Sequence, residues 1–319
     1  MNHLYDEARQ AMEHSSTIAI AGHVNPDGDC YGSVLGLGLS LLACGKQVTM
    51  LAEDFYSHYS YIPGFERLQK ADPEQNYDLF IRVDLGSRDR MGSAAMALDR
   101  SAFSINFDHH LDNDALCDIV IHQPEASSTC EILGDFIYET GLPMTADAAT
   151  ALYTGLTTDS NRFLYDSSGP RTLRIAARLM ESGAEVQRIY LQEYQNEDPA
   201  MVMFRGDVIR EALKLHEGRI VLANLPQERI SRYGLSMPQA EGVVDDMRSL
   251  SGVEIAVILK EEAPDLQKIS FRSKAYYDVS TLAAHFLGGG HKKAAGGRIE
   301  AGNAEAFERL RSFLEEISW

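Results

Sequence analysis

The chain has 319 residues, 45% of them hydrophobic, which is enough for two domains with separate cores. Its 47 acidic residues outnumber its 29 basic ones, for a net charge of −18, and this argues against a long nucleic-acid track because such tracks are extended basic surfaces. No run of about 18 apolar residues occurs, so no membrane partner is expected.

The first 16 residues are polar and acidic, which favours an amphipathic helix over a secretory signal. The four cysteines form no CxxC pair, a pattern typical of reduced thiols, so we expect a cytoplasmic protein. A homodimer could form through the edges of a sheet or through the N-terminal helix.

Short β-rich runs alternate with helical patterns through the first half of the chain. Strands are predicted at 16–22, 47–52, 77–84, 102–107 and 117–122, and helices at 32–45, 127–140, 145–158 and 170–183. The alternation predicts an α/β domain over residues 1–184, with a mostly parallel sheet and helices on both faces.

The pattern changes over residues 185–217, where Asp198 and Pro199 are typical of a helix start, and we interpret this segment as a helical linker. A smaller α/β domain is predicted over 218–319. Its strands are expected at 219–225, 253–260 and 266–274, with helices near 238–250 and from Asp278. The glycine-rich stretch 288–297 is interpreted as an anion-binding loop that leads into a helix, and the alternative is a flexible loop packed tightly against a strand.

The segment "HVNPDGD" places His23, Asp27 and Asp29 close together between turn-forming residues. Carboxylates this close repel one another unless a cation lies between them. The alternative interpretation is a turn followed by a helix cap, because Asn, Pro, Asp and Gly are common in turns.

More such side chains follow other predicted elements: Asp84 ends the third strand, "DHH" (108–110) follows the fourth, and Asp159 follows a helix. Ligands of parallel sheets bind at the carboxyl ends of the strands, so these residues should gather at one edge. Carboxylates and imidazoles suit Mn²⁺ or Mg²⁺ better than structural zinc. The candidate ligands are His23, Asp27, Asp29, Asp84, His109 and Asp159. Six ligands are too many for one ion with open positions but suffice for two ions that share a carboxylate.

Four segments resemble, in order, the motifs of the DHH phosphoesterase family: "HVNPDGD", "VDLG", "DHHLDN" and "GLTTDSNRF". The later "GGGHKKAAGG" resembles the signature of the C-terminal domain associated with that family. The resemblance spans nearly the whole chain and is strongest to the two-domain bacterial type that degrades very short RNA and dephosphorylates pAp. A glycine is common in the family where Asn161 stands, which leaves the local turn open.

The resemblance implies two metal ions, usually manganese, with magnesium as the alternative. One ion would be held by His23, Asp27 and Asp84, and the other by Asp29, Asp84, His109 and Asp159. The expected catalytic residues are Asp84, Asp108, His109 and His110. Asp108 would orient a neighbouring histidine or loop, His110 would face the substrate, and Asn113 would fix the loop after the third motif. Two roles are left open for Asn25: its side-chain amide donates a hydrogen bond to the phosphate, or the residue only forms a turn.

Basic side chains concentrate near the C-terminal signature despite the acidic composition: Lys268, Arg272, Lys274, His291, Lys292, Lys293 and Arg298. The resemblance implies that Arg272 and His291 grip a terminal phosphate or base. Gly289 and Gly290 would let the backbone approach the anion. We therefore expect hydrolysis of very short RNA to mononucleotides and of pAp to AMP.

Other functions share the same ligand set. A phosphodiesterase of linear or cyclic dinucleotides (pApA or c-di-AMP) would need identical metal ligands, and pyrophosphatase or exopolyphosphatase activity is a further alternative. A long-strand exonuclease fits less well because no basic track is present. A non-catalytic binding module is disfavoured because all six ligand positions carry competent side chains.

Overall fold

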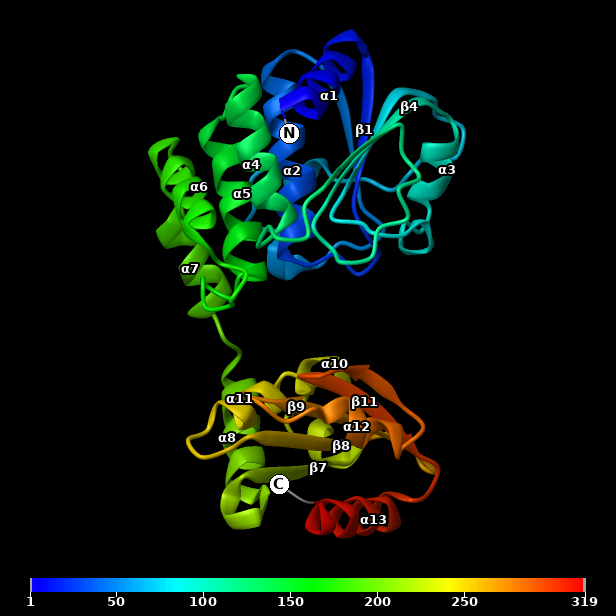
Figure 1. The fold of residues 1–319 in the computed structure, drawn as a ribbon, viewed down its shortest axis with the longest axis vertical. Coiled ribbons are helices and arrows are strands. Elements are labelled where there is room, and N and C mark those ends of the chain that lie inside the picture. The colour runs from blue at the N-terminus through cyan, green and yellow to red at the C-terminus, as the bar shows by residue number, and fades with distance from the viewer. Residues whose placement is uncertain (1, 318–319) are drawn as a thin grey trace. The chain divides into compact units, whose positions relative to one another are not determined.

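The structure is a computed structural model that describes residues 2–317, and it divides into two units between Gln195 and Asn196 (Figure 1). The sequence predicts a separate helical linker over 185–217, whereas here the boundary between the units falls inside that segment. Helix α7 (Val186–Tyr194) packs against α5 (Ala146–Asp159) of the first unit, whereas α8 (Pro199–Glu211) packs against the sheet of the second. Each helix buries its apolar side chains in a different core, so the predicted linker is shared between the units.

The first unit contains the predicted parallel sheet, and all its strand pairs are parallel. The strand order is β2-β1-β3-β4-β5, with bounds β1 Thr17–Ala21, β2 Gln47–Leu51, β3 Tyr77–Val83, β4 Ser101–Asp108 and β5 Ile119–His122. The α/β prediction for this half of the chain is therefore confirmed. The central strands are buried on both faces, as their continuous apolar runs indicate.

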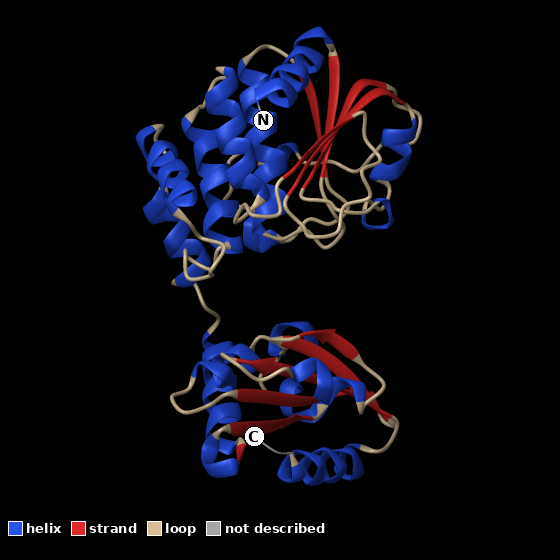
Figure 2. Cartoon of the chain, viewed as in Figure 1, coloured by secondary structure: helices blue, strands red, loops and turns tan. Residues whose placement is uncertain are grey.

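Helices cover both faces of this sheet (Figures 1 and 2). One face carries α1 (Asn2–His14), α2 (Gly28–Ala43) and α4 (Thr129–Thr140), and α5 and α6 (Pro170–Glu181) pack against these helices. The other face carries the short α3 (Ala94–Asp99), which the sequence pattern did not reveal. Alternation along β3 sends Leu79, Ile81 and Val83 into the larger core and Phe80 into the smaller one.

Helices α2 and α5 approach each other closely because glycines line their interface. A Cβ atom on Gly32 would lie 2.6 Å from the Ala151 carbonyl oxygen, and one on Gly155 would lie 2.8 Å from an Asp29 carboxylate oxygen. The contact brings the first turn of α2 against the last turn of α5. Asp29 and Asp159, far apart in sequence, are thereby placed side by side.

The second unit contains a mixed six-stranded sheet in the order β10-β11-β9-β8-β7-β6. The strands are β6 Leu213–Leu215, β7 Ile220–Leu225, β8 Ile255–Ala263, β9 Leu266–Ser273, β10 Gly289–His291 and β11 Ala294–Ile299. The helices are α8, α9 Gln227–Ser231, α10 Met237–Ala240, α11 Val243–Ser249, α12 Val279–Ala284 and α13 Asn303–Glu316. Two cores lie against this sheet, one with α8 and α11 and the other with α12 and α13.

The glycine-rich stretch 288–297 corrects our expectation of a loop leading into a helix. It folds as an antiparallel hairpin of β10 and β11 that extends the sheet beyond β9. Glycine has a low strand propensity, but the backbone hydrogen bonds with β9 favour a strand here. A Cβ on Gly288 would lie 1.9 Å from the Gly296 carbonyl oxygen, so side chains are excluded by the close approach of the two backbones. Within residues 2–317, each helix falls short of the length and apolar character needed to cross a membrane.

Candidate metal centre

Five candidate ligands lie at the carboxyl edge of the first sheet or at adjoining helix ends. His23 follows β1, Asp84 follows β3, and His109 follows β4. Asp29 lies in the first turn of α2 and Asp159 is the last residue of α5. Parallel strands end at the same edge, which is why residues from distant segments meet there.

Asp84 stands at the middle of this cluster and is almost completely buried. Its Oδ2 lies 3.4 Å from His23 Nε2, and its Oδ1 lies 3.6 Å from His109 Nε2. Thr129 donates a hydrogen bond from Oγ1 to Oδ1 at 3.2 Å. The two oxygens of one carboxylate thus face two different imidazoles, as a carboxylate that bridges two cations would.

His109 faces two further carboxylates. Its Nε2 lies 3.5 Å from Asp159 Oδ2 and 3.9 Å from Asp29 Oδ2. On the other side of Asp84, His23 Nε2 lies 3.9 Å from Asp27 Oδ1. The structure therefore brings together all six side chains that the sequence singles out.

In the first motif, the structure shows both a turn with a helix cap and a cluster of candidate metal ligands. Asp27 caps α2, because its Oδ1 accepts the backbone N–H groups of Asp29 and Cys30 at 3.1 and 3.0 Å. Asp29 lies inside the helix, and its two oxygens accept N–H groups of Thr129 and Cys130 at the start of α4, at 2.7 and 2.9 Å. Turn and cap geometry are therefore the means by which the carboxylates are aimed.

The carboxylates repel one another in the metal-free protein. Burial raises the pKa of Asp29 well above its usual range, and the charges of Asp84 and Asp159 raise it further. Burial also raises the pKa of Asp159 to about 6, although His109 opposes the shift. Burial acts in the same direction on Asp84, but its contacts with His23, His109 and His110 outweigh it and lower the pKa. Without a cation, the cluster therefore disfavours the ionised forms of Asp29 and Asp159.

The imidazoles present the correct nitrogen for a cation. His23 donates from Nδ1 to the Val24 carbonyl at 2.8 Å, which leaves the lone pair of Nε2 toward Asp84. Among the described residues, the ion pairs of Asp27, Asp29, Asp84 and Asp159 involve histidines and no Lys or Arg. This donor set fits divalent cations. The buried Cys30 lies close to His23 and Asp84, but burial raises the pKa of its thiol, so it remains protonated and packs.

The rest of the third motif forms a second network beside the ligands. Asp108 Oδ1 lies 2.7 Å from His110 Nδ1, and Asn113 donates from Nδ2 to Asp108 Oδ2 at 2.6 Å. The hydrogen bond that His110 donates to the Asp108 carboxylate raises the pKa of His110. His110 is partly exposed, with its side chain 34% accessible, whereas Asp108 is completely buried.

The structure gives the backbone conformation at two positions whose roles the sequence leaves open. Asn25 has a φ of 53°, donates its N–H to Asp54 and accepts from the Tyr56 hydroxyl, so it acts as a turn residue here. Asn161 has a φ of 47°, a conformation that asparagine adopts more readily than most residues, so it replaces the family's glycine without losing the turn.

The second unit places Arg272 and His291 in one row across β9, β11 and β10, because Ala294 pairs with both. Residues in one cross-strand row point to the same face, so both side chains lie on one side of the sheet. Arg272 lies 3.7 Å from Asp245, and His291, Gly289 and Gly290 are exposed. Gly290 has a φ of 142°, and a Cβ there would lie 2.6 Å from the Ala294 carbonyl oxygen.

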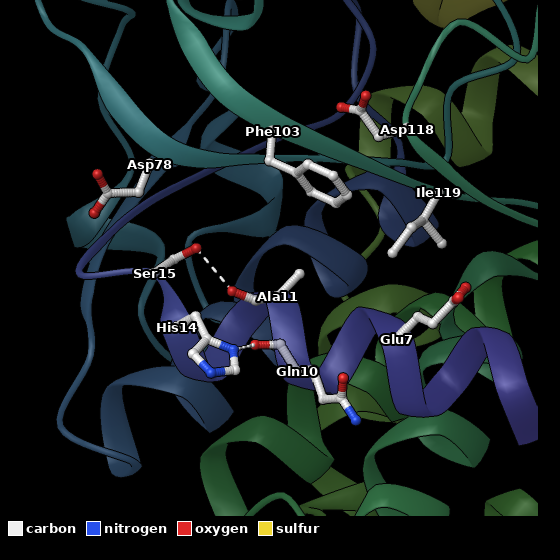
Figure 3. Close-up of a pocket in the computed structure, with 9 residues that line it drawn as sticks. All are labelled: Glu7, Gln10, Ala11, His14, Ser15, Asp78, Phe103, Asp118 and Ile119. Atoms are coloured by element: carbon white, nitrogen blue, oxygen red, sulfur yellow. Dashed lines mark hydrogen bonds between the residues drawn. The ribbon is translucent and has the colours of Figure 1, made fainter.

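A large hollow of about 620 Å³ lies away from these sites, at the amino ends of the strands (Figure 3). It is lined by α1 and by residues such as Asp78, Phe103 and Asp118. Asp78 already accepts the N–H groups of Ser16 and Thr17, and Asp118 accepts that of Ser104. Asp78 therefore holds the start of β1, and Asp118 holds β4 beside the start of β5.

Sequence reasoning missed Thr129 and Arg82. Thr129 supplies both a backbone N–H to Asp29 and a hydroxyl to Asp84. The helix start at Ser128, with Glu131 three residues later, could have indicated that an N-terminus faces the site. Arg82 offered no such signal, because an arginine within an apolar strand is ordinarily assigned to an edge.

Comparison with known proteins places the chain in a family. Residues 17–156 match the DHH family, N-terminal domain, and residues 219–318 match the DHHA1 domain. The bifunctional oligoribonuclease and PAP phosphatase NrnA of Thermus thermophilus is 28% identical over 320 residues, covering 99% of this chain and 94% of that protein. The protein of the same name from Bacillus subtilis is 26% identical, covering 89% of each chain.

A solved structure extends this likeness over the entire fold. The crystal structure of an exopolyphosphatase-related protein from Bacteroides fragilis superposes with a TM-score of 0.86 at 26% identity, covering 99% of this chain and 97% of that one. Together with the two domain matches and the clustered motif residues, this shows that the chain belongs to the DHH family and carries a C-terminal DHHA1 domain.

Proposed function

We propose that this protein is a two-metal phosphoesterase that hydrolyses very short oligoribonucleotides to mononucleotides and removes the 3′-phosphate of pAp to leave AMP. The observation that carries the proposal is Asp84, whose two carboxylate oxygens face two separate imidazole groups. The names of the relatives from Thermus thermophilus and Bacillus subtilis support the choice of substrates.

His23, Asp27 and Asp84 would hold one cation, and Asp29, Asp84, His109 and Asp159 would hold the other. Manganese is our choice for both, because a mixed imidazole and carboxylate set suits Mn²⁺ better than Mg²⁺, which prefers oxygen ligands and retained water. Divalent cations bound there would supply the Lewis acidity that phosphate ester hydrolysis needs.

The chain's own residues supply the proton. Asp108 holds His110 through Nδ1 and raises the pKa of the ring, which favours the protonated form. The remaining N–H at Nε2 is then available to a phosphoryl oxygen or to the leaving oxygen of the substrate. Asn113 keeps Asp108 in place by donating to its other oxygen.

Arg272 and His291 would bind a terminal phosphate or a base of the substrate. Arginine suits this role because its planar fork binds two phosphate oxygens at once. A short substrate carries few phosphates and needs no extended basic surface, which agrees with the net charge of −18. The described cysteines are unpaired, which supports a reducing compartment, and we propose the cytoplasm.

The test is a substrate panel on metal-depleted protein restored with Mn²⁺ or Mg²⁺. It compares pAp, RNAs of two to five nucleotides, a 20-nucleotide RNA, pApA, c-di-AMP and polyphosphate. We expect fastest turnover of pAp and the shortest RNAs, with Mn²⁺ more effective. A preference for the 20-nucleotide RNA would contradict the proposed selectivity for short substrates. A preference for polyphosphate would instead support the activity named for the Bacteroides fragilis structure.

A further inference from the structure

We propose that Arg82, buried in β3, is a positioning residue for the metal centre. It fixes two loops at once: the loop after β3, which begins with Asp84, and the loop after β4, which carries His109 and His110. The inference rests on the metal centre of the proposed function. Arg82 itself is none of the expected ligands.

The first contact of Arg82 holds the peptide that follows Asp84. Asp84 has a φ of 55°, in the left-handed region that costs free energy for a residue with a side chain. The next carbonyl, that of Leu85, accepts hydrogen bonds from Arg82 Nη2 at 3.1 Å and from Asn106 Nδ2 at 3.4 Å. Two donors on neighbouring strands thus hold the strained turn that aims the central carboxylate.

The second contact of Arg82 reaches the loop after β4. Its Nη1 donates to Asp114 Oδ1 at 2.8 Å. The other oxygen of Asp114 accepts the Arg88 N–H at 2.7 Å, and the Asp114 N–H donates to the Gly86 carbonyl at 2.8 Å. Asp114 therefore joins the two loops, and Arg82 anchors that junction to the sheet.

The junction is connected to the catalytic histidine through its neighbour in sequence. Asn113 precedes Asp114 and donates to Asp108, which in turn holds His110. A shift of Asp114 would therefore move Asn113 and release the ring of His110. The loops are also in close contact, because a Cβ on Gly86 would lie 2.1 Å from the Asp112 carbonyl oxygen.

The burial of Arg82 indicates that this residue positions the two loops and adds little to the stability of the fold. Arg82 is completely buried, and within the part of the chain that the structure describes its Nε has no partner and its one ion pair is with Asp114. Buried ion pairs contribute little to stability, and apolar residues of similar size often replace them without loss. A charge kept in this position is therefore explained better by the geometry it imposes than by the stability it adds.

The experiment compares Arg82→Met, Arg82→Lys and Asp114→Asn with the control Asp118→Asn. Asp118 lies at the far end of the same loop and accepts only from Ser104 among the described hydrogen bonds. For each variant, Mn²⁺ binding to the metal-depleted protein is measured by titration with electron paramagnetic resonance of free Mn²⁺. The melting temperature and kcat for pAp at saturating Mn²⁺ are measured alongside.

We expect Arg82→Met to keep or raise the melting temperature while weakening Mn²⁺ binding roughly 10–100-fold and lowering kcat by a similar factor. Arg82→Lys should recover part of both, since one amine can reach one of the two acceptors. Asp114→Asn should weaken Mn²⁺ binding and also lower the melting temperature, because it leaves Arg82 without a counter-charge. Asp118→Asn should change neither binding nor kcat.

Unchanged Mn²⁺ binding and kcat in folded Arg82→Met would overturn the inference, as would an equal loss in Asp118→Asn. The binding titration also separates this proposal from the proposed function. Wild-type protein that binds Mn²⁺ but cleaves none of the nucleotides would contradict the proposed substrates, and the binding data would still decide the role of Arg82. Wild-type protein that binds no Mn²⁺ would overturn both.

Discussion

Replacing Asp159 with asparagine should stabilise the metal-free protein at neutral pH. Burial raises the pKa of Asp159 from 3.8 to about 6, so its ionised form is less stable in the folded protein than in the unfolded chain. Stability from this group is complete below pH 4 and is lost as pH rises through 6. The shift is worth about 3 kcal/mol at 1.36 kcal/mol per pKa unit. Because 31% of the side chain is exposed, screening reduces the effect to about 1–2 kcal/mol.

The assay is urea unfolding of EDTA-treated wild type and Asp159→Asn between pH 4 and pH 7.5, followed by circular dichroism. The free energy of unfolding of the variant should exceed that of the wild type by an amount that grows with pH to about 1–2 kcal/mol. Saturating Mn²⁺ should reverse the order, because a bound cation stabilises only the protein with the complete ligand set. A metal-free variant that is less stable than the wild type at pH 7.5 would refute this account of the site's electrostatics.

Three further predictions follow from single contacts. Asp84→Ala should abolish turnover and Mn²⁺ binding yet leave the circular dichroism spectrum unchanged, and retained activity would mean that the site is misassigned. Arg272→Lys should lower kcat/KM for pAp about 10-fold with Mn²⁺ affinity unchanged, since the two-oxygen fork is lost; a change in Mn²⁺ affinity instead would contradict a separate substrate role. Gly86→Ala should lower both activity and melting temperature, because the added methyl group would clash with the Asp112 carbonyl oxygen. Gly206→Ala is the control: this glycine lies in the exposed part of α8 with nothing within 4 Å of an added Cβ, so the change should raise the free energy of unfolding by about 0.5–1 kcal/mol. Equal effects of the two changes would refute the steric argument.

The metal cluster could be predicted from sequence because its ligands follow strands. Asp84 and His109 come directly after buried apolar runs, and a parallel sheet gathers such positions at one edge. The turn residues of the first motif indicated close packing there. Spacing could not reveal that Asp27 and Asp29 also cap α2 and α4, because that depends on how the two helices start against each other.

Other parts of the molecule depend on contacts that no local pattern encodes. The hairpin at 288–297 forms because β9 offers a free edge, although its glycines resemble a loop. Arg82 interrupts an apolar strand, and its value is visible only when Leu85 and Asp114 are seen around its guanidinium. Helix α3 has only six residues, which is too short for a helical repeat of apolar residues to stand out from the surrounding loops.

The glycine-lined contact between α2 and α5 makes the ligand set sensitive to changes that touch no ligand. A methyl group added at Gly36 would meet the Leu152 side chain at 2.5 Å, two turns along α2 from Asp29. Separating the two helices at this point would tilt them relative to each other and move the Asp29 carboxylate away from that of Asp159. Substitutions in this interface would therefore inactivate the protein even if all six ligands were retained. Any redesign must keep the spacing between α2 and α5 constant as well as the ligands.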